Sequence, residues 1–210
     1  AYYADKPPKE FVLKRYDSTM IALAAKLFDG IKVGPSKAKR HLKLTTEFIG
    51  EGLIRIEPFC TQSFLSEETA LPAQMKTRKR SDYEVLIFDR WIKSRQTFKE
   101  LASTPFLADD PLAAGSTAFI TRVNPDVRYD VIKTLSDSSS ELKLDCLVRL
   151  YQSGAHQVDQ DFRLIVLAGN QEPIYLVTNL MEIEADQVGQ LYRRRWDIEV
   201  LFRFMKQELH

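Results

Sequence analysis

The sequence predicts an α/β fold in which helices flank a mixed sheet. Two observations indicate this class. Short stretches of alternating apolar and polar residues, typical of strands with one buried face, recur along the chain, with helical patterns between some of them. Residues 85–88 are apolar throughout, which is expected of a central strand that is buried on both faces.

The first part of the chain predicts strands and helices in alternation. A strand at residues 11–16 leads into Asp17, and further strands are expected at 39–49 and 53–59, around a turn at 50–52. A helix begins near Ser66 with Pro72 in its first turns. The buried strand 85–88 ends at Asp89. A helix at 93–102 and a strand at 117–123 follow.

From residue 124 to 179 the pattern becomes rich in strands. Strands are expected at 127–135, 142–151, 162–167 and 174–178, separated by serine-rich and glycine-containing turns. The last element, at about 184–209, is a long helix without proline. We therefore expect residues 1–123 and 180–210 to form one core, interrupted by a β-rich insertion at 124–179. The final helix is expected to continue in a longer protein.

Composition bounds the class of protein. The chain has 210 residues, 44% hydrophobic and 28% charged, as in ordinary globular proteins with one sizeable core. It contains no apolar stretch near the roughly 20 residues that cross a bilayer, and its start predicts no export signal. Cys60 and Cys146 lie far apart, which favours a reduced cytoplasmic chain with two packed thiols. The three histidines lack zinc-ligand spacing.

The net charge of +1 is low for a nucleic-acid-binding domain, but the positive charge is clustered. Basic residues gather at 37–43, at 76–80 and at 193–195. Each cluster is equally compatible with a solvated surface. Composition therefore permits DNA binding without establishing it.

The last helix carries a polar stripe. An α-helix turns by about 100° per residue, so Tyr192, Arg195, Glu199 and Lys206 share an arc of roughly 60°. This stripe runs along the edge of the apolar face and is suited to lining a cleft. The alternative interpretation is that Arg195 and Glu199, four positions apart, simply stabilise an exposed helix.

These four residues resemble the Tyr-Arg-Glu-Lys signature of the insertion-sequence DDE transposases, the group that includes the cut-and-paste hairpin-forming enzymes. Tyr192, Arg195, Glu199 and Lys206 match the family spacing of two, three and six intervening residues without a gap. The flanking residues 191–196 and 202–207, and residues 177–180 upstream, are also similar to the family. The resemblance extends over nearly the whole chain, from about residue 11.

The resemblance implies an RNase H-like sheet with three catalytic acids. Asp17 corresponds to the first and Asp89 to the second, with Glu199 as the third and a β-rich insertion between the last two. Together they would hold two Mg²⁺ ions, with Mn²⁺ as a substitute, because hard ions prefer carboxylate oxygens. Asp17 alternatively serves as a strand-end or turn residue, and Asp89 as the cap of the next helix. Trp91 and Ile92 depart from the family, which often has glycine and an aromatic residue there, so Trp91 is a candidate DNA contact.

The resemblance further implies a DNA transposase that cleaves transposon ends and transfers them to target DNA. Tyr192, Arg195 and Lys206, with Arg194 and Arg90, are its expected contacts to double-stranded DNA. The family works as a homodimer on paired ends, in the bacterial cytoplasm with the nucleoid and without membrane partners. Two alternatives are a metal-dependent nuclease of the same fold that does not join DNA, and a transposase-derived DNA-binding protein without catalysis.

Overall fold

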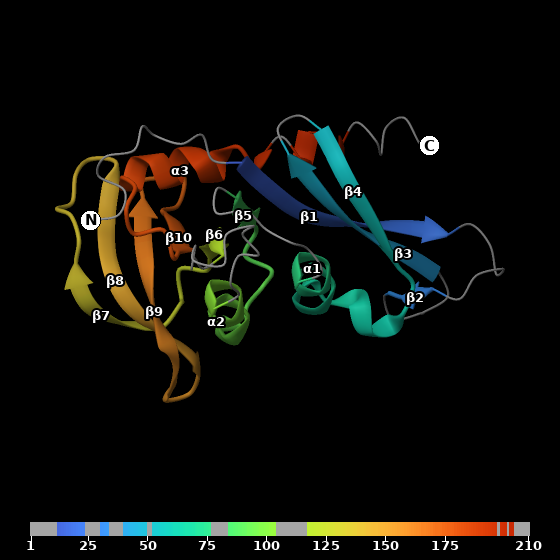
Figure 1. Cartoon of the computed structure of the whole chain (residues 1–210), viewed down its shortest axis with the longest axis horizontal. Helices are drawn as coiled ribbons and strands as arrows, with labels where there is room; N and C mark the ends of the chain where they lie inside the picture. Colours follow the sequence, from blue (N-terminus) through green and yellow to red (C-terminus); the bar gives the residue numbers. More distant parts are fainter. Residues whose placement is uncertain are drawn as a thin grey trace, which may run out of the picture. The chain divides into compact units, whose positions relative to one another are not determined.

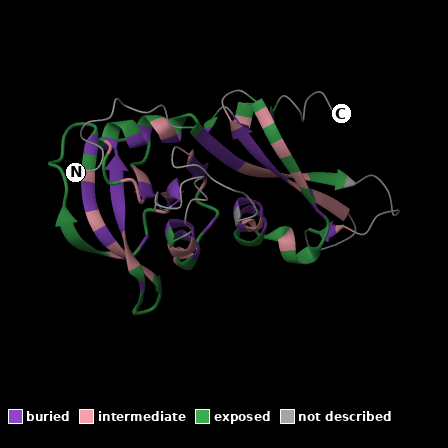
Figure 2. Ribbon diagram, viewed as in Figure 1, coloured by how far each residue is buried: buried purple, intermediate pink, exposed green. Residues whose placement is uncertain are grey.

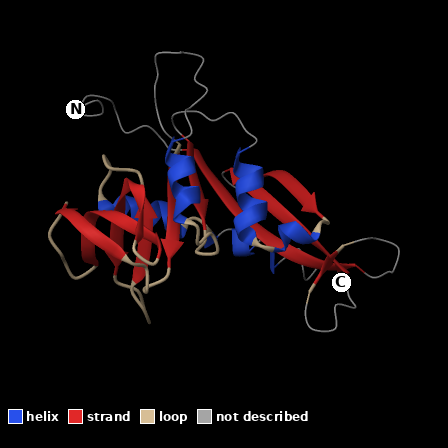
Figure 3. Ribbon diagram, turned by 90° about the horizontal axis from the view of Figure 1, so that it is seen from below, coloured by secondary structure: helices blue, strands red, loops and turns tan. Residues whose placement is uncertain are grey.

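The computed structural model describes residues 12–23, 30–33, 40–49, 52–76, 84–103, 117–196, 198–200 and 202–203. The chain divides into two compact units. Unit 1 consists of residues 1–13 and 79–195, and unit 2 of residues 14–78 and 196–210. Each unit combines strands with helices (Figures 1 and 3), so the predicted α/β class is confirmed.

Unit 1 contains a mixed sheet with the strand order β5-β6-β10-β9-β8-β7. The strands are β5 (Glu84–Phe88), β6 (Ala118–Val123), β7 (Tyr129–Thr134), β8 (Leu142–Ser153), β9 (His156–Leu167) and β10 (Ile174–Thr178). β5 and β6 are parallel, whereas the other neighbouring pairs are antiparallel. All the strands predicted between residues 85 and 178 are present, and the predicted mixed sheet is confirmed.

β5 is buried on both faces, as its apolar sequence predicts. Its last four residues are fully buried (Figure 2). Val85 and Ile87 face an aliphatic cluster that includes residues of helix α3 (Ala185–Arg193). On the other face, the ring of Phe88 lies 6.2 Å from that of Phe98 in helix α2 (Arg95–Ser103). The two helices therefore cover opposite faces of the sheet, and β5 ends between them.

The predicted long helix at 184–209 is wrong, because α3 ends at Arg193. Arg194 and Arg195 form a turn in which the Arg195 N–H donates to the Tyr192 carbonyl at 3.0 Å, the shorter 3₁₀ pattern. Helical residues resume at Trp196 and include 198–200 and 202–203. The break coincides with the boundary between the units, since Arg195 belongs to unit 1 and Trp196 to unit 2. No proline or glycine marks it in the sequence, so tertiary contacts determine it.

Unit 2 contains an antiparallel sheet in which β3 (Arg40–Ile49) pairs with three strands. These are β1 (Val12–Leu23), β2 (Ile31–Lys32) and β4 (Gly52–Phe59). The short helix η1 (Gln62–Leu65) and helix α1 (Glu67–Lys76) follow, and Pro72 lies within α1. Asp17 was expected at the end of a strand, but β1 continues to Leu23 because β3 pairs with it along its whole length from Lys14. Asp17 is therefore a mid-strand residue.

The two cysteines differ in environment. Both are free thiols, Cys146 buried and Cys60 exposed, so the expectation of two packed thiols is wrong for Cys60. Burial raises the pKa of Cys146 to about 11, which keeps this thiol protonated at neutral pH. Among the described residues, no helix is long and apolar enough to cross a membrane.

A buried ion pair joins β8 and β9. The guanidinium of Arg163 donates to both carboxylate oxygens of Asp145 at 2.8 Å, and Ser136 Oγ donates to the same carboxylate at 2.5 Å. Burial alone would raise the pKa of Asp145, but the hydrogen bonds from Arg163 and Ser136 and the charge of Arg163 outweigh it and lower this pKa below its ordinary value. The ion pair therefore stabilises the fold when Asp145 is ionised.

We expect this pair to make the stability of unit 1 acid-sensitive. Because the folded-state pKa of Asp145 is lowered, its contribution is fully present above the ordinary pKa and is lost as the pH falls through the folded-state value, below about 4. Urea unfolding at pH 7 and pH 3 should show a smaller pH dependence for Asp145→Asn than for the wild type. Asp159→Asn, at an exposed position of β9, is the control. Equal pH dependence in Asp145→Asn and the wild type would contradict this role.

Candidate functional site

Asp89 lies directly after the buried strand β5, and its side chain is 22% exposed. Thr121 Oγ1 of the neighbouring strand lies 3.5 Å from its carbonyl oxygen. The helix that follows is capped by another residue, because the Thr97 N–H donates to Ser94 Oγ at 3.3 Å. The alternative interpretation of Asp89 as the cap of that helix is therefore wrong. Its carboxylate is held by other partners.

Those partners are Tyr192 and Arg195. The Tyr192 hydroxyl donates to Asp89 Oδ1 at 3.2 Å, although the residues are 103 positions apart in sequence. Arg195 Nη2 lies 3.9 Å from Asp89 Oδ2, and Arg195 Cζ lies 5.8 Å from the centre of the Tyr192 ring. Both Tyr192 and Arg195 are only 5% exposed. The fold thus brings two members of the Tyr-Arg-Glu-Lys pattern to the second predicted acid.

The electrostatics of this group keep Tyr192 a hydrogen-bond donor. Burial, and secondarily the charge of Asp89, raise the pKa of Tyr192 well above its ordinary value, although the charge of Arg195 acts in the opposite direction. The phenol therefore remains protonated at neutral pH. An arginine guanidinium stays positively charged in proteins, so the charge of Arg195 partly offsets the negative charge of Asp89.

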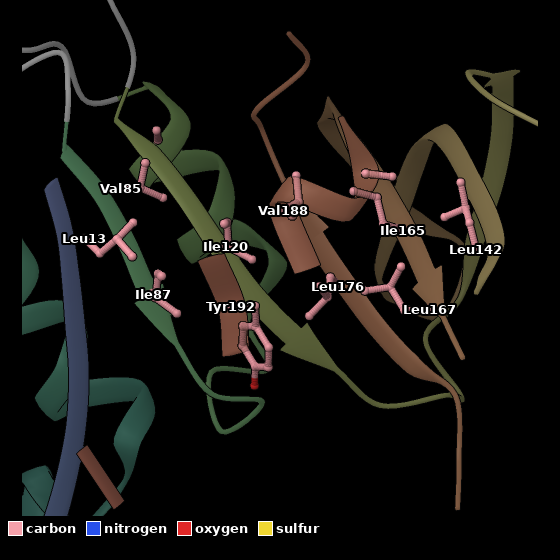
Figure 4. Close-up of a cluster of buried hydrophobic side chains, with 12 residues drawn as sticks. Leu13, Val85, Ile87, Ile120, Leu142, Ile165, Leu167, Leu176, Val188 and Tyr192 are labelled. Atoms are coloured by element: carbon pink, nitrogen blue, oxygen red, sulfur yellow. The ribbon is translucent and has the colours of Figure 1, made fainter. Parts of the chain in front are cut away.

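Close packing of α3 on the sheet places Tyr192. Its ring belongs to the aliphatic cluster of unit 1, and its hydroxyl points away from that cluster (Figure 4). One turn earlier, a Cβ on Gly189 would stand 2.5 Å from Leu167 Cδ1 of β9. Glycine at this position allows the helix to approach the strand closely. We infer that this approach helps to set the depth at which the phenol reaches Asp89.

Asp17 lies in the sheet of unit 2 and is half-buried. Its Oδ1 accepts the Ser18 N–H at 2.8 Å, and its carbonyl accepts Thr46 Oγ1 at 3.1 Å. Thr46 is also its register partner in β3. The extended strand on both sides excludes the alternative interpretation of Asp17 as a strand-end or turn residue.

The helical residues around Glu199 cover the face of this sheet on which Asp17 lies. Thr46, the β3 partner of Asp17, lies two positions before Phe48. The side chains of Asp17, Thr46 and Phe48 therefore project from the same face of the sheet. Phe48 packs against Ile198 and Phe202 on that face. Glu199, between them in sequence, is half-buried. Unit 2 therefore carries two of the predicted acids on one side of its sheet.

The remaining predicted residues have different environments. Arg90 and Arg194 are exposed, as is Trp91, at 56%. Lys206 lies outside the described residues. Lys43 belongs to the basic cluster at 37–43, but its side chain is only 2% exposed and is paired with Glu67 rather than solvated. In the part of the chain that the structure describes, no three His, Cys, Asp or Glu side chains form a group that could hold a metal ion.

Sequence reasoning missed the residues that support this site. Arg163 donates to the Ile183 carbonyl, just before α3, and Gln152 accepts the Arg95 N–H at the start of α2. The signal for Arg163 was present: a lone arginine inside the otherwise apolar stretch 162–167 predicts a buried charge with a partner. Gln152 carries no such signal, because glutamine at a strand end is ordinary.

The comparisons with known proteins concern the family of the chain. Residues 65–210 match a family model described as "Transposase DDE domain". The chain is 28% identical over 95 residues to "Probable transposase for insertion sequence element IS5377" of Geobacillus stearothermophilus, which is 44% of this chain and 25% of that protein. It is 32% identical over 104 residues to a protein named as transposase y4zB of Sinorhizobium fredii (strain NBRC 101917 / NGR234), which is 47% of this chain and 29% of that protein.

Among solved structures, the chain is similar to a piggyBac transposase synaptic complex with hairpin DNA. The sequence identity is 14% and the TM-score 0.49, and the match covers 94% of this chain and 41% of the other. The matches to the two curated relatives span only 25% and 29% of their lengths. The family model, however, covers more than half of the chain. The chain therefore belongs to the family of transposase DDE domains.

Proposed function

We propose that this chain is the catalytic part of an insertion-sequence DNA transposase of the Tyr-Arg-Glu-Lys group, with an RNase H-like fold. The observation that carries the proposal is the contact of Asp89 with Tyr192 and Arg195. Tyr192 and Arg195 match the signature, and Asp89 matches the second acid of the family. Their contact in unit 1 supports this proposal, and membership of the DDE family supports it independently.

Asp17, Asp89 and Glu199 are proposed to hold two Mg²⁺ ions. Their donor chemistry fits, because all three offer carboxylate oxygens, the ligands that this hard ion prefers. Among the described residues, the carboxylate of Asp89 has Tyr192 as a partner at Oδ1 and Arg195 near Oδ2, while an ionised carboxylate has about four acceptor sites. Lone pairs thus remain for a metal. When bound, a pair of such ions stabilises the attacking and the leaving oxygen of a phosphoryl transfer.

The proposed reaction is a sequence of phosphoryl transfers at one site. Water attacks the phosphodiester at the transposon end, and the leaving 3′-oxygen takes up a proton to become a 3′-hydroxyl. That hydroxyl attacks a phosphodiester of the opposite strand and displaces the 3′-oxygen of the flanking DNA, which takes up a proton, so that the transposon end becomes a hairpin. Water hydrolyses the hairpin and frees the 3′-hydroxyl again, and this hydroxyl then attacks a phosphodiester of target DNA and displaces its 3′-oxygen. Arg195 and Lys206 would grip phosphates beside the scissile bond, with Tyr192 as a hydrogen-bond donor. The exposed Arg90 and Arg194 would add backbone contacts.

The whole protein is proposed to act on two DNA ends as a homodimer, associated with the bacterial nucleoid. Within this chain, residues 1–123 and 180–210 would form the catalytic core. Residues 124–179 would be a β-rich insertion, whose strands β7 to β10 extend the sheet of unit 1 without a break. The insertion is therefore proposed to be part of the same folded layer.

Arg195→Ala is expected to weaken binding to a transposon-end duplex. Loss of a charge-assisted contact costs about 1.5–3 kcal/mol, or roughly a 10- to 150-fold higher Kd. Fluorescence anisotropy at several salt concentrations gives the slope of log Kd against log salt concentration. For Arg195→Ala this slope should be smaller by about the contribution of one phosphate contact. Arg149→Ala, which removes a half-exposed arginine from unit 1, is the control. Unchanged affinity and unchanged products in both Arg195→Ala and Lys206→Ala would contradict the phosphate-grip role.

A strand-transfer assay with pre-cut transposon ends tests the proposed function. In Mg²⁺ or Mn²⁺, the wild type should nick uncut ends and join pre-cut ends to target DNA, and Glu199→Gln should do neither. Nicking without joining would instead identify a nuclease of the same fold. DNA binding without any cleavage in either metal would identify a non-catalytic DNA-binding protein. Both of these results overturn the proposal.

A further inference from the structure

Strand β8 contacts the start of α2, the helix that follows Asp89, and strand β9 contacts the loop before α3, the helix that contains Tyr192. We propose, on the basis of the function proposed above, that Arg163 of β9 is a positioning residue. It fixes the start of α3 so that Tyr192 and Arg195 meet Asp89. The β-rich strands would then be part of the framework of the site.

All three nitrogens of the Arg163 guanidinium donate hydrogen bonds. Nε and Nη2 donate to the two oxygens of Asp145 at 2.8 Å, which orients the planar group. Nη1 then donates to the carbonyl of Ile183 at 2.6 Å and lies 3.3 Å from that of Leu180. Arg163 is 4% exposed and Asp145 1%. A rigid, buried fork therefore ties β8 and β9 to the loop that precedes α3.

This loop determines where α3 begins. Its first residue, Asn179, is hydrogen-bonded to β6 and to Thr117, the residue just before that strand. Asn179 Nδ2 donates to the Thr117 carbonyl at 2.8 Å, and Asn179 Oδ1 accepts the Phe119 N–H at 3.0 Å. Its last residue, Glu184, forms the capping box of α3. Between these two points Arg163 holds the carbonyls. Tyr192 follows the first residue of α3 by about 10 Å along the axis, at about 1.5 Å per residue. A tilt at the start of α3 therefore displaces the phenol from Asp89.

The same pair of strands holds the helix that follows Asp89. Gln152 Oε1, at the end of β8, accepts the N–H groups of Arg95 at 2.6 Å and Gln96 at 3.1 Å at the start of α2. These are donors that a helix start leaves without intrahelical partners. Asp89 thus lies between one helix capped by β8 and another held through β9. This double attachment distinguishes the arrangement from an ordinary buried ion pair.

The test compares Arg163→Met with Arg149→Met. Arg149 and Asp161 form an ion pair across the same two strands, at 2.6 and 2.9 Å, but it is about 40% exposed. Each variant removes one arginine-aspartate pair from β8 and β9. Arg163→Lys keeps the charge but cannot serve Asp145 and the two carbonyls together. If Arg163→Met does not fold, the measurements on Arg163→Lys test the proposal instead.

Three measurements are made on each folded variant. They are the Kd for a transposon-end duplex, the single-turnover cleavage rate, and the ¹⁹F resonance of Tyr192 in protein labelled with 3-fluorotyrosine and assigned with Tyr192→Phe. For Arg163→Met we expect a cleavage rate reduced by about a hundredfold, as a displacement of the order of 1 Å can cause, with a Kd that rises by less than the roughly 10- to 150-fold expected for Arg195→Ala. The Tyr192 resonance should move, and Arg163→Lys should lie between. Arg149→Met should match the wild type in all three.

A folded Arg163→Met, or Arg163→Lys in its place, with wild-type cleavage and an unmoved Tyr192 resonance would overturn the proposal. So would equal losses in Arg149→Met and Arg163→Met. The ¹⁹F measurement needs neither DNA nor metal. If the wild type does not cleave DNA but the resonance moves only in the Arg163 variants, the proposed function fails while the positioning role stands.

Discussion

Asp89→Asn is expected to abolish metal-dependent cleavage of transposon-end DNA while the domain stays folded. Asparagine keeps the size of the side chain and a carbonyl oxygen to accept the Tyr192 hydroxyl, but it removes the negative charge that would hold the metal. Metal-assisted charge stabilisation contributes several kcal/mol to the transition state, so the loss should be at least about a thousandfold. Asp17→Asn and Glu199→Gln should give similar losses.

The measurement is single-turnover nicking of an end duplex in Mg²⁺, with circular dichroism and urea unfolding to confirm folding. Asp159→Asn is the matched control, because it removes one carboxylate charge at an exposed position of unit 1. It should cleave at the wild-type rate. Near-normal cleavage by Asp89→Asn would show that Asp89 is misassigned. Equal loss in Asp159→Asn would show that net charge, rather than this carboxylate, is responsible.

Glu67→Ala is expected to destabilise unit 2 by about 3 kcal/mol, because it leaves a buried ammonium group without its counter-ion. Lys43 is 2% exposed, with Nζ 3.1 Å from Glu67 Oε1 and 2.6 Å from the Leu65 carbonyl. Ser18 Oγ also donates to Glu67. The carboxylate therefore joins α1 to both β1 and β3. Urea unfolding at neutral pH should show the loss as a lower midpoint.

The double variant Lys43→Met with Glu67→Leu should recover most of this stability. Replacing both members of a buried ion pair with apolar side chains of similar size is often neutral, whereas removing one member is costly. Glu68→Ala, at the exposed neighbouring position of α1, is the control and should change little. If Glu67→Ala behaves like Glu68→Ala, Lys43 does not depend on this partner. A double variant less stable than Glu67→Ala would contradict the ion-pair explanation.

Local patterns predicted the elements whose burial is uniform. Residues 85–88 are apolar because both faces of β5 are covered, and the position of Asp89 follows from where that run ends. Two boundaries could not be predicted, because distant residues determine them. β1 passes through Asp17 because β3 provides partners for it. The last helix is interrupted at Arg194, at the boundary between the units and next to the Asp89 contact of Arg195.

The candidate site was predicted only in part. The resemblance to the family identified Asp89, Tyr192 and Arg195, whose contacts the fold provides. The helical arc that grouped Arg195 with Glu199 assumed one continuous helix, and the break at Arg194 removes that assumption. The buried pair of Lys43 escaped prediction because its partner, Glu67, lies in α1, which follows β3 only after β4 and η1.

The most direct test of the account is a crystal structure with bound transposon-end DNA and Mn²⁺, in which anomalous scattering locates the metal. We expect manganese to be coordinated directly by carboxylate oxygens of Asp17, Asp89 and Glu199. Manganese bound elsewhere, or a metal site that excludes any of these three carboxylates, would contradict the account.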